Sequence, residues 1–172
     1  YSFHIKETGQ QVAALLYAGS AIGVTFAGDF FTLFIYWEIM AVASTYLIWA
    51  RRTTESQKAG IRYLLYHVLG GGLLFAGILL HISKIGGTTL ITGKLAQGPL
   101  SSWLILLGVV INAAVPPLHA WLSDAYPKAT VTGAVFLSAF TTKSAVYVLL
   151  RLFPGWEILL IFGTVMTVYG VI

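Results

Sequence analysis

The sequence predicts an all-α membrane protein, a bundle of about six spanning helices in which the fourth is broken at Pro116 and Pro117. Three observations lead to this fold class. The 172 residues are 58% hydrophobic and only 9% charged, against about 25% charged residues in ordinary soluble domains. The mean hydropathy is +0.84. The apolar residues also gather in segments near the roughly 20 residues that a spanning helix needs.

The predicted helices follow the apolar segments in order: Val12 to Ala27, Phe30 to Ala50, Arg62 to Ile82, Trp103 to Val115 with a continuation to about Leu122, Gly133 to Leu152, and Trp156 to Ile172. Only Gly28 and Asp29 separate the first two, and Asp29 can cap the second helix. Three glycines in the third helix, residues 70–72, permit close packing or a local distortion. The long link from Ser83 to Ser102 is rich in Gly, Thr and Lys and is typical of a surface loop.

The fourth helix must break at its proline pair. Pro116 and Pro117 have no amide hydrogen and would clash with the carbonyls of Asn112 and Ala113, four residues earlier. Irregular backbone at membrane depth persists only where it is buried in protein or lines a wet cavity. Asn112, the freed carbonyls and His119 are therefore expected to surround one polar pocket. His119 either moves protons, since imidazole titrates near neutral pH, or only hydrogen-bonds a backbone carbonyl.

The chain is interpreted as one transmembrane domain, residues 1–172, without a separate soluble domain or a short-period repeat. It begins with Tyr1 rather than Met, and no signal-peptide pattern opens it. It is still apolar where the sequence stops. These features predict a piece of a longer chain.

Charge placement predicts the orientation. With the first helix running outward from the cytoplasm, the outer side holds only Lys84, Lys94 and Arg151. The inner side then holds the other loop cations: Lys6, Arg51, Arg52, Lys58, Arg62 and Lys128. The positive-inside rule favours this arrangement. Because these cations flank apolar runs and the net charge is only +4, they anchor helices, and no nucleic-acid partner is expected.

Several kinds of chemistry are excluded. The chain has no Cys, which rules out disulfides, thiolate metal sites and thiol catalysis. None of the four His residues pairs with another at metal-ligand spacing, and no phosphate loop or nucleophile elbow is present. We expect no cofactor, no metal and no catalytic residue.

Lys143 is the first candidate site residue. It lies about ten residues into the fifth helix, roughly 15 Å deep and near the middle of a ~30 Å hydrocarbon core. Burying its charge costs at least about 2.5 to 3.5 kcal/mol, so it should face the bundle interior, a partner or water. Burial disfavours the charged form and would let the amine carry a proton reversibly. The alternative is a structural cation that pairs with a carboxylate and locks two helices.

Glu38 supplies such a carboxylate. It lies about eight residues into the second helix, with the small residues Ala41, Val42 and Thr45 at the spacing of its own face. Small neighbours allow another helix to approach closely. Glu38 either pairs with a cation or holds a proton, and both outcomes suit a relay.

Three further polar residues are accessory candidates. His67 follows Tyr63 and Tyr66 at helical spacing and has either a packing role or a place in the relay. Asp124 is near a helix end, where it is solvated, caps a helix or helps to fill the inner mouth of a proton path. Thr142, beside Lys143, can extend a water chain or can satisfy its own helix backbone.

The chain closely resembles the antiporter-like subunits shared by respiratory complex I, membrane-bound hydrogenases and Mrp-type sodium/proton antiporters. The resemblance lies in two runs, LFIYWEIM and VPPLHAWLSDAYPKATVTGAVFLSAFTTKSAVYVLLR. It covers about Asp29 to Arg151 and joins a "WE" helix, a broken "P-x-H-x-W-L-x-D-A" helix and a following "TK" helix.

This resemblance implies a proton relay in the membrane plane, with Glu38 and Lys143 as members, and a fold of two inverted five-helix repeats. Residues 12–152 would form the first repeat, and residues 156–172 would begin the following helix. The family usually carries a lysine on the broken helix, but this chain has Asn112 there, seven residues before His119. Either Lys143 or a water chain takes over the pairing with Glu38, or the half-channel or the ion moved is different.

The resemblance also implies partners: other membrane subunits of a larger complex, the lipid bilayer, and protons or Na⁺. The expected location is a bacterial or archaeal cytoplasmic membrane, and the expected role is a translocase subunit without redox chemistry of its own. Two alternatives stay open. One is a structural subunit that only holds a complex together, and the other is a stand-alone transporter with an aromatic-lined cavity near Trp121 and Tyr147.

Overall fold

The computed structural model describes residues 7–88 and 94–171, and the predicted positions Lys6 and Ile172 lie outside this part. Its elements are helical: α1 (Thr8–Phe26), α2 (Phe30–Trp49), α3 (Thr54–Ile85), α4 (Leu100–Asn112), α5 (Ala120–Ala125), the 3₁₀ turn η1 (Tyr126–Lys128), α6 (Val131–Leu152) and α7 (Ile158–Val171). No strand occurs in the described ranges. The predicted all-α fold class is confirmed.

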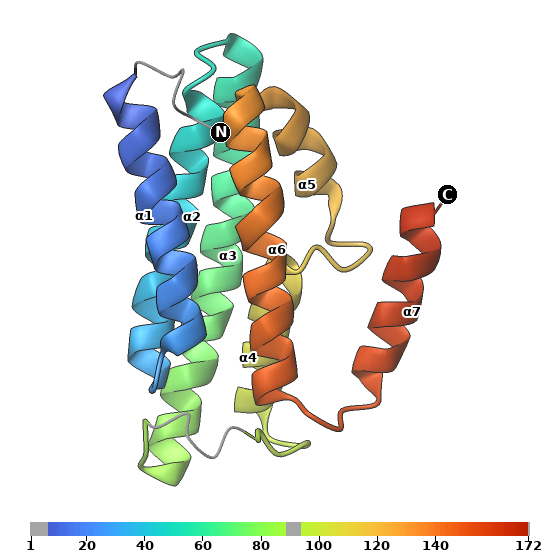
Figure 1. The fold of residues 1–172 in the computed structure, drawn as a ribbon. Helices are drawn as coiled ribbons and strands as arrows, with labels where there is room; N and C mark the ends of the chain where they lie inside the picture. The colour runs from blue at the N-terminus through green and yellow to red at the C-terminus, as the bar shows by residue number, and fades with distance from the viewer. Residues whose placement is uncertain (1–6, 89–93, 172) are drawn as a thin grey trace.

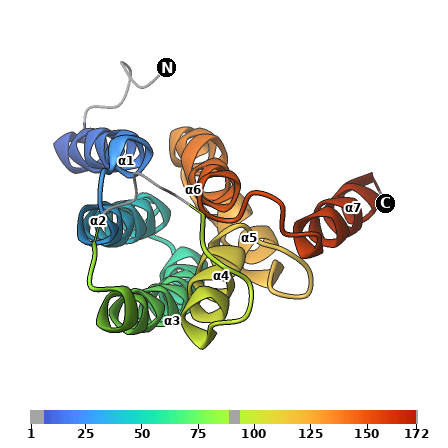
Figure 2. The ribbon, with the colours of Figure 1, turned by 90° about the horizontal axis from the view of Figure 1, so that it is seen from below.

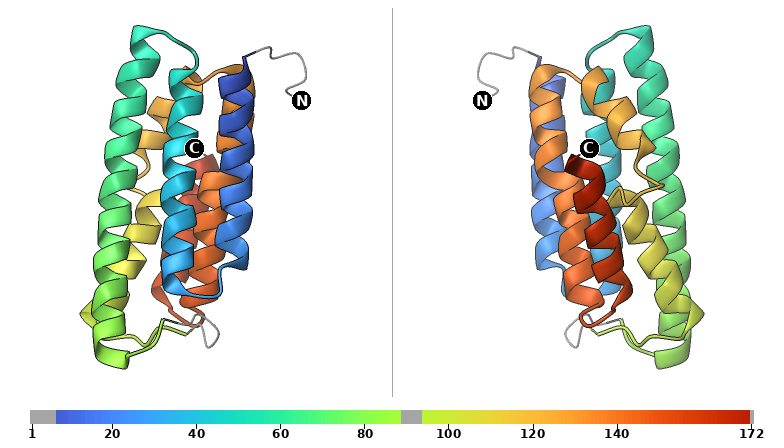
Figure 3. Two further views of the ribbon diagram at one scale, coloured as in Figure 1. Left: turned by 90° about the vertical axis from the view of Figure 1, so that its left-hand side faces the viewer. Right: turned by 90° about the vertical axis from the view of Figure 1, so that its right-hand side faces the viewer.

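The helices form an up-and-down bundle (Figure 1). Seen along its axis, α1, α2, α3 and α4 follow one another around one side, and α6 closes the bundle across from them (Figure 2). α5 packs beside α3 (Figure 3), and α7 stands apart from the other helices (Figures 1 and 2). Among the described residues, three helices are long and apolar enough to cross a membrane, Phe30–Trp49, Thr54–Lys84 and Val131–Leu152, and two shorter apolar ones accompany them.

Capping explains where α2 and α3 begin. Asp29 caps α2, accepting a hydrogen bond from the Thr32 amide at 2.9 Å as predicted. α3 begins at Thr54, eight residues before the predicted start, because Thr53 and Ser56 form a capping box. The sequence prediction followed only the apolar run, whereas this polar first segment is stabilised by its cap.

The predicted break in the fourth helix is confirmed, but it starts earlier than expected. α4 ends at Asn112, not at Val115, and regular helix resumes only at Ala120. Ala114 has a φ of 58°, and the Pro116–Pro117 bond is cis. The last helix likewise begins at Ile158 rather than at Trp156.

The α3–α4 contact is made backbone to backbone. A Cβ atom added at Gly108 would lie 2.6 Å from the Gly70 carbonyl oxygen and 2.7 Å from the Leu74 nitrogen. No side chain fits there, so glycine is required at Gly108. This close approach brings the end of α4 against the glycines of α3, where the site residues meet.

Candidate functional site

Glu38 rests on the backbone of α3. Its Oε1 atom is buried and has no hydrogen-bond partner among the described residues. A Cβ atom at Gly71 would collide with this oxygen. The predicted close packing at the glycines is therefore present, and its effect is to let a carboxylate lie directly against a helix backbone.

Asn112, the last residue of α4, lies against the neighbouring glycine of α3. It is fully buried, and neither atom of its amide group has a partner in the described ranges. Its Oδ1 lies 3.3 Å from the position that a Cβ atom of Gly70 would take. Glu38 and Asn112 thus lie against adjacent glycines of one helix, at one depth in the bundle.

Lys143 lies at the same depth on α6. The Leu47 carbonyl oxygen of α2 is 3.1 Å from the position of a Gly133 Cβ atom, which aligns the two helices. Gly133 and Leu47 therefore mark one level. Lys143 lies about 15 Å along α6 from Gly133, and Glu38 lies about 14 Å along α2 from Leu47, in the same direction. We call Glu38, Asn112 and Lys143 the midmembrane layer.

The side chain of Lys143 is exposed, in a groove that α6 forms with Ile22 and Thr25 of α1. The sequence predicts that Lys143 faces the bundle interior, a partner or water. In the described part of the chain it does not face the interior. Glu38 is half-buried. No ion pair within the described ranges joins the two.

Asn112 and His119, predicted to share one polar pocket with freed carbonyls, have different neighbours: Asn112 lies against Gly70 of α3, and the His119 ring faces α7. The Ile111 carbonyl accepts hydrogen bonds from the Ala114 amide at 3.2 Å and from the Trp121 indole at 2.9 Å. The Ile111 carbonyl is thus taken up by the turn and by an indole. The His119 ring turns toward α7 and packs edge-on against Tyr169, with ring centroids 4.6 Å apart.

His67 is buried on the inner face of α3. Its Nδ1 lies 2.9 Å from the Tyr63 carbonyl oxygen, and its ring stacks on the Tyr63 ring with centroids 3.9 Å apart. The Trp121 ring packs against it in a T-shaped arrangement, with ring centroids 4.8 Å apart. The packing role is present, and Nε2 remains buried without a partner among the described residues.

Sequence reasoning missed a buried hydroxyl cluster, made by Tyr17, Ser44, Tyr63 and Thr141. The Tyr63 hydroxyl donates to Ser44 at 2.8 Å and lies 3.3 Å from the Thr141 hydroxyl, which also bonds Tyr17. Each member comes from a different helix, so only their hydroxyl groups within apolar segments could have pointed to it. Thr142, the predicted accessory residue, is half-buried beside this cluster.

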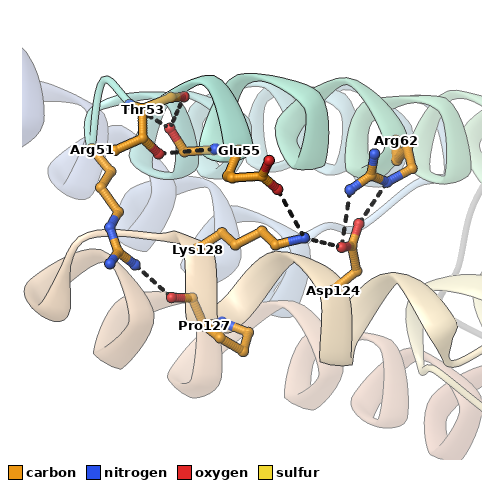
Figure 4. Close-up of polar contacts among 8 residues, drawn as sticks. Arg51, Thr53, Glu55, Arg62, Asp124, Pro127 and Lys128 are labelled. Atoms are coloured by element: carbon orange, nitrogen blue, oxygen red, sulfur yellow. Dashed lines mark hydrogen bonds and ion pairs between the residues drawn. The ribbon is translucent and has the colours of Figure 1, made fainter.

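At the end of the bundle that is predicted to face inward, charged groups are paired. Arg62 donates to Asp124 at 2.7 and 3.0 Å, and Lys128 lies 2.6 Å from Asp124 and 3.9 Å from Glu55 (Figure 4). We call these four residues the inner-end cluster. Hydrogen bonding by Arg62, with a further contribution from Lys128, lowers the pKa of Asp124 to about 2. Arg51 adds a hydrogen bond of 2.6 Å to the Pro127 carbonyl, so α5 and η1 are held against α3.

Comparison with known proteins gives a consistent set of relatives. The profile of a family described as NADH:quinone oxidoreductase/Mrp antiporter, TM, matches residues 27–171. NADH-quinone oxidoreductase subunit M of Escherichia coli (strain K12) is 34% identical over 157 residues, covering 80% of this chain and 31% of that protein. One Na⁺/H⁺ antiporter subunit from Alkalihalophilus pseudofirmus is 30% identical over 154 residues, covering 83% of this chain and 19% of that protein.

Solved structures agree in fold. A chain of the Mrp complex from Dietzia sp. superposes with a TM-score of 0.75 at 27% identity, covering 80% of this chain and 28% of that one. A chain of respiratory complex I from Thermus thermophilus gives a TM-score of 0.81 and covers 95% of this chain and 38% of that one. At 22% identity, the second match bears on the fold alone. The chain spans about a third or less of the length of the curated relatives described above.

Proposed function

The chain belongs to the NADH:quinone oxidoreductase/Mrp antiporter transmembrane family, and from this premise we propose that it moves protons within a multi-subunit membrane complex. Its route is the midmembrane layer, in which Lys143 takes up and releases a proton under the influence of Glu38. Asn112 lies beside that route, and His119 exchanges protons near the break. Residues 12–152 act as the first five-helix repeat of a longer chain in a bacterial or archaeal cytoplasmic membrane.

One observation carries this proposal: three polar side chains from three helices share one depth, and two of them rest against adjacent glycines. A charge at that depth costs at least about 2.5 to 3.5 kcal/mol. Since Glu38 and Lys143 form no ion pair with each other in the described ranges, this energy is not offset by a lock between them. The arrangement favours a transport role over a purely structural one.

A stand-alone transporter for an organic solute has less support. Trp121 and Tyr147, the aromatic residues expected around its cavity, are engaged in helix packing. The Trp121 indole donates to the Ile111 carbonyl at 2.9 Å, and the Tyr147 hydroxyl donates to the Thr25 carbonyl at 2.8 Å. Both residues therefore tie elements together.

The test is proton movement across sealed vesicles that contain the whole complex with the full-length chain, read with a pH-sensitive dye. Lys143→Ala should slow it by at least about a hundredfold, because the carrier of the proton is removed. Glu38→Gln should slow it by roughly tenfold, because only the bias on Lys143 is lost. Repeating the measurement with and without Na⁺ identifies the ion.

Lys58→Ala is the matched control, since Lys58 is an exposed cation near the inner end. It should leave the rate unchanged, and assembly is checked for every variant. Parent rates in an assembled Lys143→Ala complex would overturn the proposed function.

A further inference from the structure

Buried polar groups without partners gather within one turn of α3. His67 Nε2, Asn112 Oδ1 and Nδ2, and Glu38 Oε1 are all buried and lack hydrogen bonds among the described residues. Such groups are rare in folded proteins, because each one left alone costs about 1–3 kcal/mol. Their gathering at one place therefore indicates a function.

The three side chains share one face of α3. Gly70, three residues after His67, contacts the Asn112 amide, and Gly71, four residues after it, contacts Glu38. Residues three and four apart on a helix are neighbours on its surface. Trp121 of α5 connects the two sides of this site. Its ring packs in a T-shaped arrangement with His67, and its indole donates to the carbonyl of Ile111, next to Asn112.

The hydrogen bond on Nδ1 determines the tautomer of His67. Nδ1 lies 2.9 Å from the Tyr63 carbonyl oxygen, and a carbonyl can only accept, so Nδ1 carries the hydrogen. In the neutral ring, Nε2 is then an unprotonated base. It is buried at the level of the unpartnered atoms, with the hydroxyl cluster one turn toward the inner end.

We propose that His67 is the proton-accepting base that serves Glu38 and Asn112, joined to them by buried water. This proposal rests on the proposed function and adds a relay member to it. A proton arriving from the inner side binds to Nε2 and gives an imidazolium, with both ring nitrogens protonated. Nε2 then releases the proton to water beside Glu38, and the neutral tautomer returns. Asn112, which has no titratable proton, orients that water through its amide.

His67→Phe tests the proposal in the same vesicles. Phenylalanine keeps a flat ring between Tyr63 and Trp121 but has no basic nitrogen, so proton movement should fall by at least about tenfold in an assembled complex. His81→Phe is the matched control. His81 is on the same helix and packs on Phe30 with ring centroids 5.2 Å apart, but it lies nearer the outer end, and its replacement should leave the rate unchanged.

A rescue separates a proton carrier from a packing residue. Asn112→Lys places a base against the same glycine, so adding it to His67→Phe should restore at least half of the parent rate. A loss caused by poor packing would not be restored by a lysine on another helix. No rescue, in a double variant that assembles, contradicts the proposal.

His67→Gln covers the case in which His67→Phe does not assemble, since glutamine is polar and of similar length but cannot take up a proton. Parent rates in either assembled variant would overturn the proposal, and so would failure of both to assemble, which would make His67 a structural residue. Lys143→Ala distinguishes a failure of the His67 role from a failure of the proposed function. If it abolishes transport while His67→Phe does not, only the role of His67 fails; if it too transports at the parent rate, the proposed function fails.

Discussion

The midmembrane layer and the inner-end cluster contain similar residue types, but the charged side chains are paired in the cluster and unpaired in the layer. At the inner end, Asp124 is paired with Arg62 at 2.7 Å and with Lys128 at 2.6 Å. In the layer, Glu38 Oε1 has no partner in the described part of the chain, and Lys143 is in no ion pair there. Paired charges near water fix helices in place, whereas unpaired polar groups at membrane depth are costly and are kept for function.

This difference assigns the two regions separate roles. The inner-end cluster joins α3 to α5 and η1, the segment that follows the break, and so maintains the broken helix in its position (Figure 4). The layer lies against glycines that leave room for a carboxylate. Changes in the layer should therefore alter transport, and changes in the cluster should alter stability.

Of the two variants that separate the layer from the cluster, Gly71→Ala should have the larger effect. The new Cβ atom would collide with Glu38 Oε1, so the carboxylate must move away from α3. Transport should fall on the order of tenfold, because small displacements of a working group are costly, while the complex still assembles. Vesicle transport assays check this.

Gly72→Ala is its control, because no other element of the described structure comes within 4 Å of the position of a Gly72 Cβ atom. It should leave transport unchanged and slightly favour the helix. Equal transport in both variants would show that the position of Glu38 against α3 is unimportant for transport.

A smaller effect, on stability alone, is expected for Asp124→Asn. Losing the pairs with Arg62 and Lys128 should lower the free energy of unfolding by about 1 kcal/mol, seen as a lower melting temperature of the solubilised complex. The pKa of Asp124 falls from 3.8 to about 2 on folding, so its stabilisation is present above pH 4. It is lost as the pH falls toward 2, where the two melting curves should converge.

Glu55→Gln should have almost no effect on melting, since Glu55 is 70% exposed and 3.9 Å from Lys128. Transport per assembled complex should stay at the parent rate in Asp124→Asn. A slowed rate with an unchanged melting temperature would instead make Asp124 part of a proton path, the other interpretation that its sequence position allowed.

Local chemistry explains how much of the fold the sequence could predict. The apolar segments and the proline pair predicted the bundle and the break, because hydrophobic length and a missing amide act on neighbouring residues. The early start of α3 depended on a polar capping box before the apolar run. At the early end of α4, the Trp121 indole of α5 bonds the Ile111 carbonyl, a contact between elements that the sequence alone does not reveal.

The candidate site could also be predicted only in part from the sequence. Glu38, Asn112 and Lys143 could be named from the sequence, because polar residues are conspicuous within apolar helices. The resemblance to a relay in the membrane plane also implied a shared depth for Glu38 and Lys143. The resting of Glu38 on Gly71 could not be predicted, since it depends on how α2 and α3 are aligned. The hydroxyl cluster unites Tyr17 with Thr141, 124 residues apart, and nothing local connects such positions.

Proton movement by Lys143→Arg in sealed vesicles is the direct test of Lys143 as a proton carrier. Arginine keeps the positive charge at the same depth but stays protonated, so it can serve as a structural cation and cannot release a proton. We predict an assembled complex whose transport is nearly as slow as that of Lys143→Ala. Transport at the parent rate would contradict the carrier role and leave Lys143 as a structural cation.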